Sequence, residues 1–435
     1  IINHAGDRFI IVDDVLLPLL ARVKDQINVE KIIVIPLTRQ PVPEGFENYE
    51  SFLATASGKF EYPDLDENEA MSMCYTSGTT GKPKGVVYSH RALVLHTFAA
   101  CLPTGVGVNS HDVVLPVVPM FHVNAWGLPF ALTLIGAKQV YPGPHLDPVS
   151  LLDLFEHEKV TFTAGVPTIW FGILQQLEKN PGGWKLTPGM RMLVGGAAAP
   201  ESMIRAFDRH DLRVIHAWGM TEMSPLGTIS SLKSYMGDLP EDDAYAYRAT
   251  QGLPSPFVDI RAVNEQGVVA WDGKTMGELQ VRGPWIAASY YKPTDPIANW
   301  TEDGWFRTGD VVTINHEGYV KITDRTKDLI KSGGEWISSV DLENAIMGHP
   351  AVAEAAVIGI PHPRWQERPI AVVVLKEGQQ ASFDDIREFL RPKFATYQLP
   401  DDVIFITTPL PKTSTGKFLK TALREQYANH VLPEM

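Results

Sequence analysis

Residues 70–85 read AMSMCYTSGTTGKPKG, and this stretch decides which fold to expect. An apolar run, typical of a buried strand, is followed directly by a loop of hydroxyl residues, glycines and lysines. Glycines let the backbone approach a ligand closely, and the lysines add positive charge, so such a loop suits a polyphosphate. The stretch therefore predicts a phosphate-binding loop at the end of a strand.

Two common phosphate-binding motifs do not fit this loop. The P-loop of kinases and GTPases needs four residues between its glycines and a Ser or Thr after its lysine. Here only two residues separate Gly78 from Gly81, and a proline follows the lysine. Residues 105–107 begin like a dinucleotide fingerprint, but Ser110 occupies the position of the third glycine. The loop must serve another kind of phosphate chemistry.

The segment TSGTTGKPKG resembles the phosphate loop of the adenylate-forming superfamily, which contains acyl-CoA synthetases, peptide-synthetase adenylation domains and luciferases. Four further segments resemble motifs of that superfamily, in the same order. They are HAWGMTE at 216–222 (second nucleotide motif), GWFRTGD at 304–310 (ribose motif), DRTKDLIKSGGE at 324–335 (hinge and thiol tunnel) and PKTSTGK at 411–417 (catalytic lysine). Together the motifs span nearly the whole chain, so chance is a negligible explanation.

The chain alternates apolar strand-like runs with helical patterns up to about residue 252, which predicts an α/β fold with parallel βαβ layers. We expect a large domain over 1–324 whose N-terminal part is missing, with a barrel-like antiparallel subdomain at about 252–324. A hinge at 325–328 and a smaller, mobile α+β domain at 329–435 complete the expected organisation. Near the start, Phe9–Asp13 and Lys31–Ile35 predict buried parallel strands joined by a crossover helix over Leu16–Gln26.

Composition narrows the class of protein. The formal net charge of -13 argues against a nucleic-acid surface, which is usually basic. Cys74 and Cys101 are too few for a disulfide scaffold and lack metal-ligand spacing. The apolar run 113–137 is interrupted by prolines, so a strand, turn and helix fit it better than a membrane span. No signal peptide is visible, so we expect a cytoplasmic enzyme.

The resemblance implies an ATP site built from several loops. The residues assigned to the nucleotide are Thr76, Ser77, Gly78, Thr79, Thr80, Lys84, Gly196, Ala197, Trp218, Gly219, Met220, Asp310 and Arg325. Asp310 is expected to accept hydrogen bonds from both ribose hydroxyls. Trp218, where the family more often has Tyr, is expected to stack on adenine. A core tryptophan and a plain turn at Asp310 are the structural alternatives.

The resemblance also implies the catalytic groups. Lys417 is expected to bridge the incoming carboxylate and the α-phosphate, whereas Lys412 is expected to be a surface residue. Thr221 would hydrogen-bond the α-phosphate, and Glu222 is the candidate Mg²⁺ ligand because it is a hard oxygen donor. A carboxylate at a helix N-terminus is the alternative for Glu222.

An acyl pocket and a thiol tunnel complete the implied site. His122, Trp126 and Gly195 are assigned to the acyl pocket. His122 is also assigned a catalytic role, as a gate between pocket and thiol, and it would share one helical face with Trp126. A satisfied core histidine is its alternative. The CoA tunnel is assigned to Lys331, Gly333, Gly334 and Trp336 and the hinge to Lys327, for which a strand-end turn is the alternative.

The predicted activity is that of an AMP-forming acid–thiol ligase using ATP, Mg²⁺ and CoA. Segments 120–130 and 331–343 look most like bacterial 3-methylmercaptopropionyl-CoA and medium-chain acyl-CoA ligases, which favours a short, apolar acid. A different aliphatic or aromatic acid stays open, as does an enzyme that loads a carrier-protein thiol. A luciferase and a non-catalytic binding protein are further alternatives. Expected partners are small molecules, with a homodimer as a further candidate and no nucleic acid or membrane span.

Overall fold

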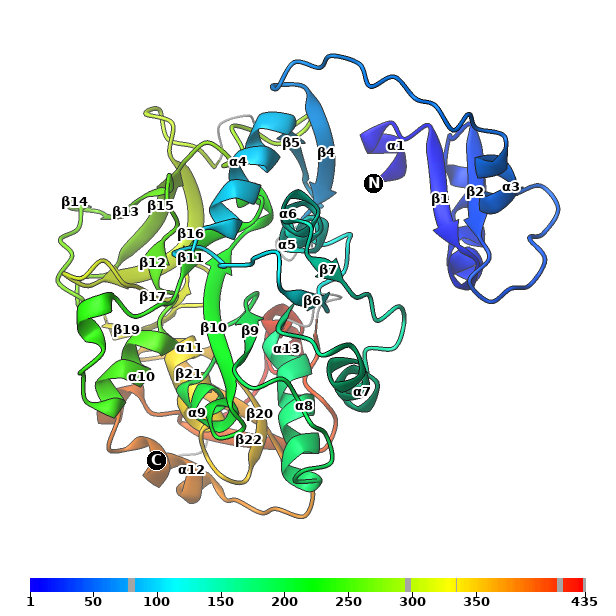
Figure 1. Ribbon diagram of the computed structural model, residues 1–435. Coiled ribbons are helices and arrows are strands. Elements are labelled where there is room, and N and C mark those ends of the chain that lie inside the picture. The colour runs from blue at the N-terminus through cyan, green and yellow to red at the C-terminus, as the bar shows by residue number, and fades with distance from the viewer. Residues whose placement is uncertain (77–82, 294–298, 334, 413–417, 433–435) are drawn as a thin grey trace. The chain divides into compact units, whose positions relative to one another are not determined.

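The computed structural model describes residues 1–76, 83–293, 299–333, 335–412 and 418–432 (Figure 1). The chain divides into two compact units, Ile1–Glu69 and Ala70–Met435. The smaller unit is a parallel three-stranded sheet in the order β1-β2-β3 with short helices. Its elements are α1 (Ile2–Ala5), β1 (Phe9–Asp13), α2 (Leu17–Ala21), β2 (Lys31–Ile35), β3 (Glu47–Asn48) and α3 (Tyr49–Ala54).

The smaller unit confirms the parallel pairing but corrects the prediction that both strands are buried. Val34 of β2 is fully buried, whereas Phe9 and Ile11 of β1 are 47% and 59% exposed. Phe9 and Ile11 are alternate residues and so share one face of β1, and the described residues leave this face open. The expected crossover helix is also shorter, because α2 is flanked by two 3₁₀ turns, η1 (Asp14–Leu16) and η2 (Lys24–Gln26).

The larger unit is built on a seven-stranded sheet in the order β12-β11-β10-β9-β8-β6-β7. The strands from β7 to β10 are parallel, and β11 and β12 are added antiparallel. This arrangement confirms the predicted α/β layers. The strands are β6 (Val113–Pro116), β7 (Lys138–Gln139), β8 (Phe162–Gly165), β9 (Met190–Val194), β10 (Leu212–Gly219), β11 (Leu226–Ile229) and β12 (Leu253–Pro254).

Helices cover both faces of this sheet, and β9 shows why. Leu193 belongs to one hydrophobic core, whereas its neighbours Met192 and Val194 belong to another, because successive side chains of a strand point to opposite faces. Helices α7, α8 and α9 pack on one face, and α4 and α6 pack on the other. The helices are α4 (His90–Cys101), α5 (Val123–Trp126), α6 (Leu128–Ile135), α7 (Pro148–Glu158), α8 (Pro167–Lys179), α9 (Glu201–Asp208) and α10 (Glu241–Ala249).

Two antiparallel pieces lie beside this layer. The hairpin of β4 (Ala70–Tyr75) and β5 (Gly85–Ser89) brackets the predicted phosphate loop. A five-stranded sheet in the order β14-β13-β15-β16-β17 follows, as expected for the predicted antiparallel subdomain. Its strands are β13 (Asp259–Asn264), β14 (Gly267–Val268), β15 (Gly277–Arg282), β16 (Phe306–Ile314) and β17 (Val320–Arg325). Ala262, Leu279 and Val320 of this sheet share a core with α4 and α6.

The C-terminal part is a further sheet of mixed strands with helices, which matches the predicted smaller α+β part. Strands β20 and β21 form its long central hairpin, with β22 parallel to β21. The elements are β18 (Ile330–Ser332), β19 (Glu335–Ile337), α11 (Ser339–Met347), β20 (Val352–His362), β21 (Gln366–Leu375), α12 (Phe383–Leu390), η5 (Thr396–Gln398), β22 (Asp402–Ile406) and α13 (Lys420–Gln426).

A buried ion pair stabilises this C-terminal sheet from within. The guanidinium of Arg368 donates from Nε and Nη2 to the two carboxylate oxygens of Asp401, each at 2.6 Å, and both residues are buried. Its Nη1 donates to Ser332 Oγ and to the carbonyl of Tyr397. Arg368 thus connects β21 to β18 and to the loop before β22.

No helix among the described residues is long and apolar enough to cross a membrane. The apolar run 113–137 instead contains the strand β6 and the helix α6, as predicted.

Candidate active site

Two adjoining cavities lie at the carboxyl ends of β9 and β10. The first, which we call the hairpin cavity, has a volume of about 480 Å³ and is lined by Thr76 and Lys84 of the β4–β5 hairpin. The second, the cleft cavity, measures about 500 Å³ and is lined by residues of α8 and α11. Their shared lining residues are Gly196, Ala217, Trp218, Gly219, Arg325 and Lys327. Ligands of open α/β sheets bind at this edge.

The hairpin cavity brings together most of the residues that the sequence assigned to different tasks. It is lined by Thr76, Lys84, His122, Trp126, Gly195, Gly196, Trp218, Gly219, Met220, Thr221, Glu222, Arg325 and Lys327. Ala197 and Asp310 line the cleft cavity instead. Ser77, Gly78, Thr79 and Thr80 lie outside the described residues.

Asp310 lies at the centre of a buried hydrogen-bonded group. Its side chain is 2% exposed. One oxygen, Oδ1, lies 2.9 Å from Arg325 Nε, and the other, Oδ2, accepts a hydrogen bond of 2.9 Å from the indole N–H of Trp218. The negative charge of Asp310 is the main cause that raises the pKa of Arg325. Arg325 therefore keeps its positive charge beside the buried carboxylate.

Trp218 has features of both interpretations of the sequence, the aromatic residue that stacks on adenine and the core tryptophan. Its ring is largely buried, and Gly227 approaches it so closely that a Cβ there would lie 2.6 Å from the ring. The same residue lines both cavities. Packing against Gly227 and the bond to Asp310 hold the indole in one place, so the aromatic plane at the cavities is rigid.

Glu222 lies in the 3₁₀ turn η3 (Thr221–Met223) and is buried. Its Oε1 accepts a hydrogen bond of 2.6 Å from the hydroxyl of Tyr290. Burial, followed by the charge of Glu222, raises the pKa of Tyr290 well above its usual value, so the phenol stays protonated and donates. The backbone of the turn is held as well, because the hydroxyl of Tyr88 donates to the carbonyl of Thr221 at 2.6 Å.

A Mg²⁺ ion that arrives with ATP fits this turn. Mg²⁺ usually binds through one or two carboxylates together with substrate phosphates and water, not in an all-protein cage. In the described part of the chain, no group of three or more His, Cys, Asp or Glu residues could hold a metal ion. The single buried carboxylate of Glu222, at the wall of the hairpin cavity, has the chemistry that such an ion requires.

The neck of the predicted phosphate loop is closed by Thr76 and Lys84. The Thr76 N–H donates to the carbonyl of Lys84 at 2.9 Å, and the Lys84 N–H donates to Thr76 Oγ1 at 3.0 Å. The Lys84 ammonium donates to Asn299 Oδ1 at 3.3 Å and lies 4.5 Å from the centre of the Tyr290 ring. A positive charge therefore lies at the cavity wall close to the residue that contacts Glu222.

The prediction that His122 and Trp126 share a helical face is wrong. Residues Val123–Trp126 have φ angles between 49° and 58°, which is the left-handed region. His122 is the extended residue before this turn, with φ −99° and ψ 96°, so it lies outside the short helix that contains Trp126. Asn124 tolerates this region, but Val123, Ala125 and Trp126 rarely adopt it, so the sequence does not signal a left-handed turn of four residues. Both side chains nevertheless line the hairpin cavity, and Trp126 packs against Gly195, where a Cβ would lie 3.0 Å from the indole.

The lining of the hairpin cavity includes a polar residue that belongs to no sequence motif. His96 of α4 is buried, and its Nε2 lies 3.4 Å from the backbone N–H of Leu226, which donates to it. Burial lowers its pKa to about 4, so the ring is neutral near pH 7. The same cavity is also lined by apolar residues, among them Val106, Val123 and Leu193.

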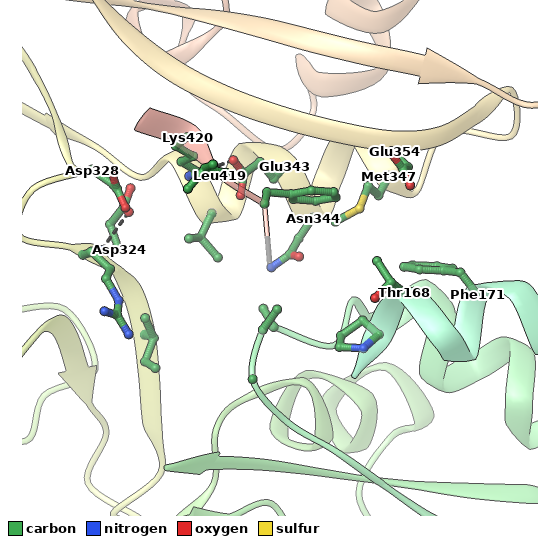
Figure 2. Close-up of a pocket in the computed structure, with 18 of the residues that line it drawn as sticks. Thr168, Phe171, Asp324, Asp328, Glu343, Asn344, Met347, Glu354, Leu419 and Lys420 are labelled. Carbon is green, nitrogen blue, oxygen red and sulfur yellow. Dashed lines mark hydrogen bonds and ion pairs between the residues drawn. The ribbon is translucent and has the colours of Figure 1, made fainter. Parts of the chain in front are cut away.

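The cleft cavity lies between α8 and the C-terminal elements (Figure 2). Thr168 and Phe171 of α8 face Asn344 and Met347 of α11 across the opening, as Figure 2 shows. Lys327, assigned to the hinge, lines both cavities, and burial lowers its pKa.

The residues assigned to the CoA tunnel lie together at β18 and β19. Gly333 has φ 62°, its N–H donates to the carbonyl of Trp365, and a Cβ there would lie 2.8 Å from the Trp365 ring. The Lys331 ammonium lies 4.9 Å from the centre of the Trp336 ring, which is 41% exposed. These three tunnel residues are not among those that line the two described cavities. Gly334 lies outside the described residues.

Lys417 also lies outside the described residues, but both flanks of its segment are described. Lys412 and Phe418 form an antiparallel bridge, and the Leu419 N–H donates to the carbonyl of Pro411 at 2.8 Å. The Lys412 ammonium pairs with Glu354 and is only partly exposed. The lysine predicted to be superficial therefore fastens one end of the segment that carries Lys417.

Several supporting residues were missed because they lie outside any motif. Tyr88 and Tyr290 contact the Thr221–Glu222 turn from distant parts of the sequence. Only the three-dimensional fold brings them there. Lys420 could have been noticed, because it follows Lys417 by only three residues in the sequence.

Residues 1–291 match the family described as AMP-binding enzyme, and residues 341–417 match the AMP-binding enzyme C-terminal domain. The chain belongs to the AMP-binding enzyme family. One relative is the long-chain-fatty-acid–CoA ligase of Thermus thermophilus, which is 51% identical over 99% of this chain and 78% of that protein. The 3-methylmercaptopropionyl-CoA ligase of Ruegeria pomeroyi is 46% identical over 98% of this chain and 79% of that protein. The medium-chain-fatty-acid–CoA ligase of Ectopseudomonas oleovorans is 42% identical over 99% of this chain and 79% of that protein.

Solved structures of AMP-binding enzymes agree with the fold. The anthranilate CoA ligase AuaEII, in complex with anthranoyl-AMP, matches with a TM-score of 0.84 at 25% identity, over 96% of this chain and 78% of that chain. ATP-bound MatB from Rhodopseudomonas palustris matches with a TM-score of 0.79 at 27% identity, over 97% of this chain and 79% of that chain. The predicted superfamily, fold class and enzyme class, an AMP-forming acyl-CoA synthetase, are therefore confirmed.

Proposed function

We propose that this AMP-binding enzyme activates a short- or medium-chain carboxylic acid with ATP and then transfers the acyl group to CoA, with 3-methylmercaptopropionate as the candidate acid. The observation that carries this proposal is the shared lining of the hairpin cavity. Residues assigned to phosphate and metal, such as Lys84 and Glu222, line the same space as the acyl-pocket residues His122 and Trp126. A carboxylate held on the acyl side would therefore meet the α-phosphate directly.

In the first half-reaction, a carboxylate oxygen attacks the α-phosphorus and pyrophosphate leaves. Two anions approach each other in this step, so positive groups must already be in place. Lys84 and Arg325 supply fixed positive charge at the cavity wall, and Lys417 is assigned the bridge between carboxylate and α-phosphate. A bound Mg²⁺ would neutralise phosphate charge, with Glu222 as its protein ligand.

The nucleoside end of ATP is assigned to the rigid group around Asp310. The carboxylate is buried between Trp218 and Arg325, and it can accept hydrogen bonds from ribose hydroxyls at the cleft cavity. The aromatic plane of Trp218 is the assigned surface for adenine. Such a prearranged site orients the α-phosphate without a further ordering cost during the reaction.

In the second half-reaction, the CoA sulfur attacks the acyl carbonyl and AMP leaves. We propose that the C-terminal domain, from residue 329 onward, rotates about Lys327 between the two steps. This proposal is supported by the separation of the assigned groups, because Lys331, Gly333 and Trp336 do not line the cavities described above. Rotation would bring the Gly333–Gly334 backbone to the acyl-AMP, where the absence of side chains leaves room for the pantetheine arm.

The choice of acid is supported by the lining of the hairpin cavity and by the relatives. His122 and Trp126 are large and occupy volume on the acyl side, which favours a short chain. The Ruegeria relative bears the name 3-methylmercaptopropionyl-CoA ligase, and the Ectopseudomonas relative that of a medium-chain-fatty-acid ligase. The Thermus relative bears that of a long-chain ligase, so acids of several lengths belong in the test.

The deciding experiment is acid-dependent ATP–pyrophosphate exchange with the full-length enzyme, across 3-methylmercaptopropionate, butanoate, hexanoate, octanoate, palmitate and benzoate. We expect the highest kcat/KM among the first four acids and a CoA thioester as product with free CoA. Preference for palmitate or benzoate would contradict the proposed acid. Acyl transfer to a carrier protein but not to free CoA would instead identify a carrier-loading enzyme.

We further propose a cytoplasmic location and a homodimer. Cell fractionation and sedimentation velocity, respectively, test these two assignments.

A further inference from the structure

Asp324, Ser339, Glu343 and Lys420 form a buried cluster, and Figure 2 labels the three charged members at the cleft cavity. The Lys420 ammonium lies 2.7 Å from Glu343 Oε1 and donates to Ser339 Oγ at 2.5 Å. Ser339 in turn donates from both its backbone N–H and its hydroxyl to Asp324 Oδ2, each at 2.6 Å. A single serine therefore connects an aspartate on one side with a lysine on the other.

The cluster joins the two sides of the proposed hinge. Asp324 lies in β17, the last strand of the antiparallel sheet, directly before the hinge residues 325–328. Ser339 and Glu343 lie on α11, and Lys420 is the first residue of α13, all after the hinge. The bonds between Asp324 and Ser339 therefore exist only while the two sides keep this orientation, whereas the Lys420–Glu343 pair lies on one side.

The same cluster fastens the C-terminal end of the segment that carries Lys417. Lys420 follows Lys417 by three residues. The other end of the segment is fastened by Lys412, which pairs with Glu354 of β20. Both Lys420 and Glu354 line the cleft cavity together with Asp310 and Arg325. In this orientation the described residues that flank the Lys417 segment therefore lie at the cavity assigned to the nucleoside.

Burial makes this cluster sensitive to orientation. Asp324 is fully buried, and the side chains of Glu343 and Lys420 are about 9% and 11% exposed. Burial raises the pKa of Asp324 despite the nearby ammonium. Separating buried charged partners leaves each without its counterpart, which costs far more than separating an exposed pair. Rotation about the hinge would remove Asp324 from both Ser339 and the Lys420 charge.

We propose that Asp324 and Lys420 are positioning residues that hold the enzyme in the orientation that presents Lys417 to ATP, so that they favour adenylation over thioester formation. This inference rests on the two-step function and the hinge proposed above. It assigns a role to two residues that touch neither acid nor nucleotide in that scheme.

The test measures the two half-reactions separately in the full-length enzyme. Asp324→Asn removes the charge but keeps the volume, and Ser339→Ala removes the hydroxyl that touches both Asp324 and Lys420. We expect each variant to slow acid-dependent pyrophosphate exchange by about tenfold, because one buried charge-assisted contact is lost. Thioester formation from supplied acyl-AMP and CoA should stay at the wild-type rate or rise, because the competing orientation becomes more populated.

A matched control crosses the same hinge at the surface. Lys321 of β17 pairs with Asp341 of α11 at 3.0 Å, and the lysine side chain is 52% exposed. Exposed pairs contribute little, so Lys321→Met should change neither half-reaction by more than about twofold.

The outcomes separate this inference from the proposed function. Equal slowing of both half-reactions, together with a lower melting temperature, would identify a purely structural cluster and overturn the inference. Unchanged rates in both variants would overturn it as well. If none of the carboxylic acids supports pyrophosphate exchange by the wild-type enzyme, it is the proposed function that fails. The variants then have no adenylation step to compare.

Discussion

At the scale of single residues, the two lysines of the PKTSTGK segment should behave very differently. Lys417→Ala is expected to cost the adenylation step on the order of 3 kcal/mol, about a hundredfold in rate, by analogy with the loss of a preorganised oxyanion donor. Pyrophosphate exchange measures this loss. Thioester formation from supplied acyl-AMP should be spared.

Lys412→Ala is the matched control for that prediction. It removes a lysine that pairs with Glu354 at the base of the same segment. We expect a loss of less than about tenfold, because a partly exposed pair contributes modestly. Equal effects of the two substitutions would contradict the assignment of Lys417.

The hydrogen bond from Trp218 to Asp310 leads to a second prediction. Trp218→Phe keeps an aromatic plane at the cavities but removes the only N–H of the side chain, so Asp310 Oδ2 loses its 2.9 Å donor. A hydrogen bond to a charged group is worth about 1.5–3 kcal/mol. We expect KM for ATP to rise about tenfold or more while KM for the acid changes little. A parallel rise in both constants would show that the indole supports the whole cavity and not the nucleoside end.

At the scale of secondary-structure elements, the Arg368–Asp401 pair is the feature that most clearly stabilises the C-terminal sheet. Arg368→Met leaves the buried carboxylate of Asp401 unpaired and also removes the donor to Ser332 of β18. Breaking a buried pair from one side costs about 3–5 kcal/mol. We expect a clear loss of stability in urea unfolding and slower thioester formation, because β18 carries Lys331 of the assigned tunnel.

Arg391→Met provides the control for the Arg368 substitution. Arg391 pairs with Glu388 on the surface, where both side chains are more than half exposed. This substitution should change the free energy of unfolding by no more than about 0.5 kcal/mol. If the two arginine substitutions destabilise the enzyme equally, the buried pair has no special role.

The sequence predicts the structure best where the functional residues lie together in one contiguous motif. The loop neck at Thr76 and Lys84, the Thr221–Glu222 turn and Asp310 could all be singled out from their segments, and they line the two cavities. The parallel strands could be predicted because buried strands read as uninterrupted apolar runs. These features depend on residues that are close together in the sequence.

The features that could not be predicted depend on tertiary contacts or on unusual backbone geometry. Tyr290 and His96 reach the site from segments without a motif, because packing alone brings them there. The left-handed turn at Val123–Trp126 contains no glycine that would announce it. The exposure of Phe9 and Ile11 reflects an uncovered face of β1, which the apolar pattern of that strand does not encode.

At the scale of the whole molecule, two buried histidines should make the enzyme sensitive to acid. Burial lowers the pKa of His96 and of His216 to about 4, from an ordinary value of 6.5. Between these values the unfolded chain binds protons that the folded chain does not, so stability is full above pH 6.5 and falls as the pH drops toward 4. Each histidine contributes about 3 kcal/mol over this interval.

Urea unfolding at a series of pH values from 7 to 4 measures this loss. His216→Asn should give a shallower decline than the wild-type enzyme, because one of the two groups no longer takes up a proton on unfolding. His157→Asn is the control, since that side chain is 83% exposed and should leave the slope unchanged. Identical slopes for the wild-type enzyme and His216→Asn would contradict the prediction.

Because the indole of Trp218 donates to Asp310, the fluorescence of Trp218 should report nucleotide binding. Indole fluorescence depends on the partner of its N–H and on the polarity around the ring. A ribose that engages Asp310 changes both at once, so ATP should shift the emission of this tryptophan. The chain contains 10 tryptophans, and the difference spectrum between the wild-type enzyme and Trp218→Phe isolates the signal of this one. Nucleotide arrival can thus be followed in real time without a label.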